Sequence, residues 1–68
     1  MLEDHEVRKM ARDILVELLL TGKVEFFGKQ YNQFKLRIWV MLIQDQYAIM
    51  SADGPKISLK GRTWLNEL

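Results

Sequence analysis

One apolar stretch constrains the fold of this 68-residue chain more than any other feature. Residues 34–43 read FKLRIWVMLI, and this stretch fits two periods. With period two, alternate residues share one face of a strand, namely Phe34, Leu36, Ile38, Val40 and Leu42. With a period of 3.6, Phe34, Ile38 and Leu42 form one helical stripe, and the other apolar side chains are scattered around the helix.

The burial that each structure requires favours the strand. A helix over residues 34–43 would be apolar nearly all round and would need cover on every side, which a chain of 68 residues can hardly supply. A strand needs cover on only two faces. We therefore predict a strand over residues 34–43 and keep a helix as the alternative.

The segments on either side predict an amphipathic helix and further strands. A helix at about residues 3–21 follows from apolar positions at helical spacing, with Gly22 as its stop: Val7, Met10, Ala11, Ile14, Leu15, Leu18 and Leu19. Residues 24–27 are rich in β-formers and predict a strand. Asp53 and Gly54 predict a tight turn that joins strands at 47–50 and 56–59.

The last residues predict a short helix. Ser58 is a suitable cap, and the apolar side of this helix consists of Trp64, Leu65 and Leu68. The expected fold is therefore a single α+β domain over residues 1–68. It has an amino-terminal amphipathic helix, an antiparallel meander of three to four strands and a short carboxy-terminal helix.

Composition argues against several classes of function. The chain has no cysteine, which excludes disulfides and thiolate chemistry. Its single histidine, His5, lies near the chain end and leaves the Ser and Thr hydroxyls without a general base. Residues 3–6 are acidic or imidazole groups in a row, without the i,i+4 spacing of helical metal ligands. We predict a protein that is not an enzyme and has no cofactor and no metal.

Two features bear on where the protein resides. Its first residues are acidic where an export signal would be basic and then apolar. The longest unbroken apolar run, residues 38–43, has six residues, whereas a membrane-spanning helix needs about 20. We expect a soluble cytoplasmic protein that has no contact with membranes.

The distribution of charge suggests a nucleic-acid contact. The net charge is only +1, but residues 21–44 carry four basic groups and one acidic group. On a strand, Lys35 and Arg37 would lie beside Trp39, a combination that can grip phosphates and stack on a base. Further candidate contacts follow in the tail: Lys56, Lys60 and Arg62. The alternative is that these side chains form an ordinary solvated surface.

The second face of the predicted sheet suggests a homodimer. Trp39, Met41 and Ile43 would emerge opposite the helix, and a contiguous apolar patch of this kind usually marks an interface. A chain of this size also buries a small core, which favours self-association. The alternative is that the carboxy-terminal helix covers these residues through Trp64 and Leu65.

The tail carries a pattern that resembles a known family. Residues 47–65 resemble the wing hairpin and final helix of small bacterial and phage winged-helix domains. The pattern I-[ST]-x-x-G-x-x-x-L is met by Ile57, Ser58, Gly61 and Leu65. This resemblance implies a recognition helix over residues 34–43. The sequence departs from the family there, because such a helix would expose Trp39, Val40 and Ile43 to DNA.

The amino-terminal half resembles a second group, the YopT-type prophage proteins. The resemblance lies in the LLL of residues 18–20, in Val24 and Phe26, and in the FKL of residues 34–36. It implies a helix followed by antiparallel strands and a homodimer. Both resemblances imply a small protein of a phage or mobile element. We expect a homodimeric nucleic-acid-associated accessory or regulatory protein, with an inhibitor or adaptor that contacts an unidentified protein as the alternative.

Overall fold

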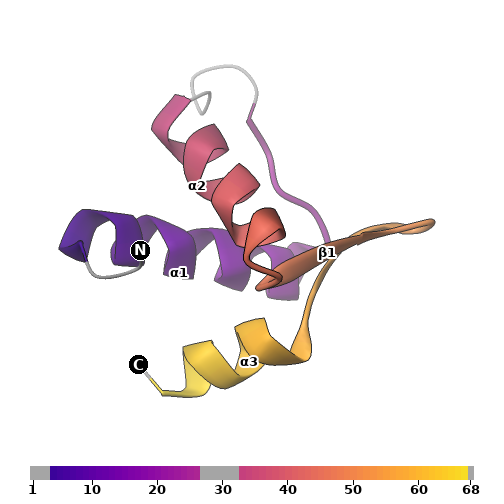
Figure 1. The fold of residues 1–68 in the computed structure, drawn as a ribbon. Coiled ribbons are helices and arrows are strands. Elements are labelled where there is room, and N and C mark those ends of the chain that lie inside the picture. The colour runs from indigo at the N-terminus through magenta and orange to yellow at the C-terminus, as the bar shows by residue number, and fades with distance from the viewer. Residues whose placement is uncertain (1–3, 27–32, 68) are drawn as a thin grey trace.

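The computed structural model describes residues 4–26 and 33–67. The elements follow in the order α1 (His5–Thr21), α2 (Gln33–Gln44), β1 (Ala48–Ser51), β2 (Gly54–Ile57) and α3 (Leu59–Asn66). Within the described residues the protein is therefore α+β, with three helices and one two-stranded antiparallel sheet. Figure 1 shows α1 between α2 and α3, with the β1–β2 hairpin projecting beyond the helices.

The ends of α1 follow from its capping residues. Asp4 has extended backbone, and its carboxylate accepts the backbone N–H groups of Glu6 at 2.8 Å and Val7 at 3.3 Å. The helix therefore begins at His5, slightly later than predicted. Gly22 ends it with φ of 76° and donates its N–H to the carbonyl of Leu18 at 2.9 Å. The predicted stop at Gly22 is confirmed.

The strand predicted over residues 34–43 is wrong, because this stretch forms most of α2. Ile38 and Leu42 are buried at helical spacing, and Trp39, Met41 and Ile43 are half-buried against the same core. Full burial on every side proves unnecessary. α1 covers one side, β1 contacts the end of the helix, and Leu36 and Val40 stay exposed. The three- to four-stranded meander is not formed by the described residues.

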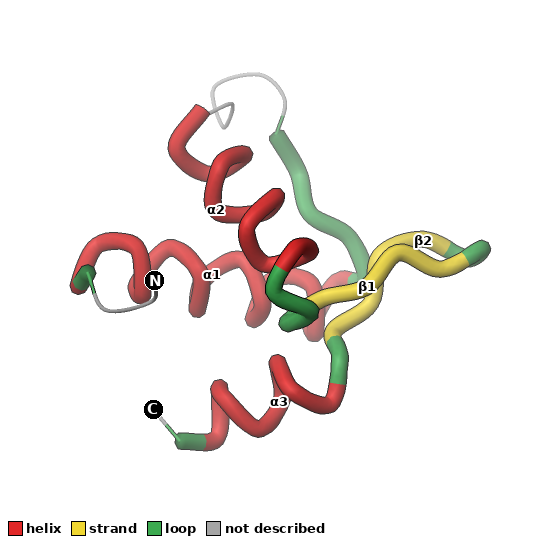
Figure 2. The backbone as a smooth tube through the Cα atoms, viewed as in Figure 1, coloured by secondary structure: helices red, strands yellow, loops and turns green. Residues whose placement is uncertain are grey.

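The strand predicted at residues 24–27 is also absent from the described part of the chain. Residues 24–26 have no regular secondary structure, and Phe27 lies outside the described residues. The N–H of Glu25 donates to the carboxylate of Glu17 at 3.0 Å, so this backbone group bonds to a side chain rather than to a strand. Figure 2 shows this loop leaving the end of α1 and running back alongside α2.

The hairpin and the last helix are confirmed. β1 pairs with β2 in antiparallel register, from Ala48 opposite Ile57 to Ser51 opposite Gly54. Gly54 has φ of 115°, as the Asp-Gly turn requires. Ser58 caps α3, and its hydroxyl accepts the N–H of Gly61 at 3.0 Å. Leu68, predicted for the apolar side of this helix, lies outside the described residues.

The core is centred on α1. Among the described residues seven apolar ones are buried, and they come from three elements: Ala11, Ile14, Leu15 and Leu18 from α1, Ile38 and Leu42 from α2, and Ala48 from β1. Trp64 and Leu65 of α3 pack against this cluster. Because α1 and β1 hold the buried side of α2, the opposite side of α2 faces solvent.

Candidate nucleic-acid interface

The outward face of α2 carries Gln33, Arg37, Val40 and Gln44. All four residues are exposed, and their spacing of four, three and four residues keeps them on one side of a helix. The helix carries no Asp or Glu at any of its positions. The outward face therefore presents amide and guanidinium donors around Val40, and α2 itself contributes no carboxylate that would repel a phosphate.

This face suits the edges of nucleic-acid bases. Arg pairs with the two acceptors of guanine, Gln pairs with the donor and acceptor of adenine, and a small apolar side chain can contact the methyl group of thymine. The sequence argument against a recognition helix was that it would expose Trp39, Val40 and Ile43. In the structure, Trp39 and Ile43 are half-buried against the core, and Val40 alone of the three is exposed.

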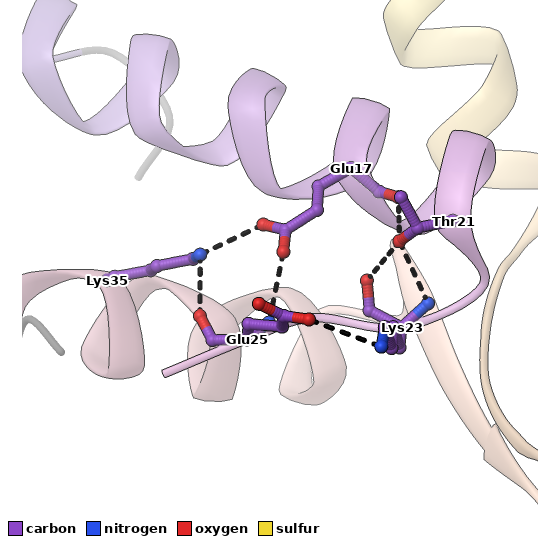
Figure 3. Close-up of polar contacts among 5 residues, drawn as sticks. All are labelled: Glu17, Thr21, Lys23, Glu25 and Lys35. Carbon is purple, nitrogen blue, oxygen red and sulfur yellow. Dashed lines mark hydrogen bonds and ion pairs between the residues drawn. The ribbon is translucent and has the colours of Figure 1, made fainter. Parts of the chain in front are cut away.

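Lys35, a predicted contact, points to the interior side of α2 instead. Its Nζ lies 2.9 Å from a carboxylate oxygen of Glu17 and 2.7 Å from the carbonyl oxygen of Glu25 (Figure 3). Burial raises the pKa of Glu17, but hydrogen bonds from Lys35 and from the N–H of Glu25, together with the charge of Lys35, outweigh it and lower that pKa. Lys35 is thus engaged within the protein.

The hairpin places the predicted contact Lys56 on β2. Lys56 lies opposite Ile49 in the β1–β2 register and is exposed, with its Nζ 3.8 Å from the carboxylate of Asp53. Both side chains of this ion pair are largely exposed, so the pair is weak in water and leaves Lys56 able to meet a phosphate. The cross-strand neighbours Met50 and Pro55 form the opposite face of the hairpin.

The two predicted contacts on α3 differ in their surroundings. Lys60 donates to the carbonyl of Asp45 at 2.8 Å, and its Nζ lies 4.5 Å from the ring centre of Tyr47. The ring of Tyr47 in turn contacts that of Trp64 at an interplanar angle of 60°, with ring centres 5.8 Å apart. Arg62 is exposed on α3, which lies on the other side of α1 from α2 in Figure 1. The five predicted basic residues therefore do not form one surface.

The sheet face used to predict a dimer interface does not exist, since residues 34–43 are helical. Trp39, Met41 and Ile43 contact the core of their own chain. Within residues 4–26 and 33–67, the most exposed large apolar side chains lie elsewhere, at Leu20, Met50 and Leu59. The homodimer itself stays a prediction.

Three residues of the outward face escaped the sequence analysis: Gln33, Val40 and Gln44. The predicted strand over residues 34–43 placed Val40 on a buried face and ended before Gln44. The signal was present in the spacing of Gln33, Arg37 and Gln44, which places these three polar side chains on one side only if the segment is helical.

The described residues contain no cluster of three or more metal-ligating side chains. In the same part of the chain, every helix is too short or too polar to cross a membrane. Comparison of the chain with protein-family models, with curated proteins and with solved structures finds no match.

Proposed function

We propose that the protein is a non-enzymatic nucleic-acid-binding module with a reduced winged-helix architecture, in which α2 is the recognition helix and the β1–β2 hairpin is the wing. The sequence resemblances support a role as an accessory or regulatory protein of a phage or mobile element. The observation that carries this proposal is the outward face of α2, with Gln33, Arg37, Val40 and Gln44 exposed and no carboxylate on the helix.

The order of the elements also supports this proposal. A helix with an exposed polar face leads through a short turn into a projecting hairpin, and the hairpin leads directly into a capped helix. In this arrangement the helix enters the major groove and the hairpin lies along the phosphate backbone. Arg37 then reads base edges, and Lys56 contacts a phosphate.

Binding to labelled DNA tests the proposal. Fluorescence anisotropy with a mixed-sequence duplex and a single strand, at several salt concentrations, measures both the affinity and its salt dependence. Each phosphate contact makes the slope of log affinity against log salt more negative by about 0.9. Arg37→Ala is expected to weaken duplex binding by about tenfold.

Arg12→Ala is the matched control, because Arg12 is an exposed arginine on α1 rather than on α2. It removes the same charge and is expected to leave the affinity within about twofold of the wild type. Equal effects of the two substitutions would show that the protein binds DNA through its overall charge and not through the outward face of α2. The absence of binding to either DNA at low salt would reject the proposal.

The second candidate function is a protein-interaction module that self-associates. Leu20 and Leu59 expose 78% and 80% of their surface, and Met50 on the hairpin exposes 63%. Burial of such apolar side chains in an interface lowers the free energy of the protein. Light scattering is expected to give about twice the chain mass of 8.1 kDa at micromolar concentration. A constant single mass up to the highest soluble concentration would contradict a homodimer.

A further inference from the structure

A cluster of polar contacts joins the start of α2 to the end of α1. Lys35 Nζ donates to Glu17 Oε1 at 2.9 Å and to the carbonyl oxygen of Glu25 at 2.7 Å, and it lies 5.4 Å from the ring centre of Phe26. Only 15% of the Lys35 side chain is exposed. Figure 3 shows Glu17 of α1 and Glu25 of the following loop converging on the ammonium group of Lys35.

The same carboxylate also holds the loop. Glu17 Oε2 accepts the N–H of Glu25 at 3.0 Å, while the hydroxyl of Thr21 donates to the carbonyl of Glu17 at 2.7 Å and contacts the backbone of Lys23. Glu17 therefore joins α1, the loop and α2 through two different oxygens. We call the contacts of Glu17, Glu25 and Lys35 the clasp.

The apolar core holds the two ends of α2 unequally. The buried residues of α2 are Ile38 and Leu42, in its middle and last turns, and its last turn is also bonded to the chain that follows, since the N–H of Tyr47 donates to the carbonyl of Leu42 at 2.9 Å. The first turn contains no buried residue. Lys35 hydrogen-bonds this turn to Glu17 of α1.

We infer that Lys35 is a positioning residue that sets the direction of α2 relative to the hairpin, and not a phosphate contact. The inference rests on the proposed function, because the two elements that it orients are the proposed recognition helix and wing. Loss of the clasp removes the hydrogen bonds that hold the first turn of α2 to α1 and to the loop. This turn can then move relative to the part of α2 that Ile38 and Leu42 anchor in the core. Gln33 then no longer meets DNA at the same time as Lys56.

Spin labels measure the predicted swing without any ligand. The chain has no native cysteine, so Gln33→Cys at the start of α2 and Ala52→Cys in the hairpin turn give a single labelled pair. Double electron–electron resonance on the full chain is expected to give a narrow distance distribution. With Lys35→Met the distribution is expected to broaden and shift. Unchanged distances in a folded Lys35→Met protein would overturn the inference.

Lys23→Met is the matched control. It removes one lysine charge from the neighbouring pair with Glu25, whose atoms lie 3.2 Å apart but whose side chains are 67% and 57% exposed. Its distance distribution is expected to equal that of the wild type. Glu17→Gln provides a second disruption of the clasp, in case Lys35→Met does not fold, and it is expected to broaden the distribution as well. A wild-type distribution in Glu17→Gln would also overturn the inference.

Salt-dependent DNA binding separates positioning from contact. If Lys35 positions α2, Lys35→Met and Glu17→Gln both weaken binding by about threefold to tenfold, because a smaller fraction of the molecules holds α2 in the binding position. The slope of log affinity against log salt then stays unchanged. If Lys35 instead contacts a phosphate, Lys35→Met makes that slope less negative by about 0.9, whereas Glu17→Gln leaves the affinity equal or higher. That second pattern would overturn the inference. A wild-type protein that binds no DNA would reject the proposed function, and the spin-label distances would still decide the role of the clasp.

Discussion

Gly61 of α3 packs directly against the backbone carbonyl of Tyr47. A Cβ atom at position 61 would overlap that oxygen and would lie 2.9 Å from the side chain of Ile57. Gly61 is buried, and its N–H is held by the cap residue Ser58 at 3.0 Å. The serine and glycine of the tail motif thus fix where α3 starts and how closely it approaches the chain before the hairpin.

Gly61→Ala is expected to lower the free energy of unfolding by about 2–3 kcal/mol, because the backbone must move to relieve the overlap. The sign is informative, since alanine stabilises an ordinary helix interior by about 1 kcal/mol relative to glycine. Urea denaturation followed by circular dichroism measures the change. Thr63→Ala, at an exposed position of the same helix, is the control and is expected to change stability little. A stabilised Gly61→Ala protein would contradict the close approach.

Ser58→Ala is expected to cost about 1 kcal/mol, the usual value for a lost helix cap. The serine hydroxyl accepts the N–H of Gly61 and donates to the carbonyl of Gln46, so it also joins α3 to the turn after α2. Thermal unfolding of Ser58→Ala and Ser58→Thr measures the effect. Threonine retains the hydroxyl and is expected to recover most of the loss. Equal stability of all three proteins would mean that the cap contributes nothing.

The stability added by the clasp is expected to depend on pH. The pKa of Glu17 is lowered from its ordinary value of 4.5 by the balance of contacts described above. A group whose folded pKa is lowered binds fewer protons in the folded state, so its stabilisation is complete above the unfolded pKa and is lost as pH falls through the folded pKa.

Urea midpoints of the wild type and Glu17→Gln test this dependence. The wild type is expected to be the more stable of the two at neutral pH, and the difference is expected to shrink as the pH falls below 4.5 and through the lowered pKa of Glu17. Asp13→Asn, at an exposed position of α1, is the control. A difference that stays constant as the pH falls would show that Glu17 contributes through packing rather than through its charge.

Trp39→Gln is expected to destabilise the protein by about 2–3 kcal/mol, because Trp39 packs against the core from α2. Val40→Gln, one position further along the same helix, is expected to change stability by less than about 0.5 kcal/mol, because Val40 is exposed. Guanidinium denaturation compares the two proteins. Similar small effects, with a change of mass in light scattering for Trp39→Gln alone, would instead place Trp39 in an interface between two chains.

Local signals in the sequence predicted α1, its stop, the hairpin and α3. Gly22 and Gly54 adopt positive φ values that the nature of the turn requires, and Ser58 caps a helix through its own hydroxyl. These features depend on residues a few positions apart. Local physical chemistry is therefore enough to predict them.

The sequence also contained the candidate site, but the assigned period concealed it. Arg37 was named as a contact, and it lies on the outward face of α2. Its neighbours Gln33 and Gln44 were missed because both lie outside the predicted strand over residues 34–43. Lys35 and Arg37 were treated as equivalent, because residues that are two positions apart on a strand share a face. On a helix they point in different directions.

Residues 34–43 mark the boundary between what the sequence by itself determined and what only the tertiary structure decided. Their composition required burial, but their pattern was compatible with both periods. The cover supplied by α1 and β1, together with the acceptor that Glu17 offers to Lys35 eighteen positions away, makes the helix the better structure. Both are contacts between distant parts of the chain, and the periodicity of one segment does not contain them.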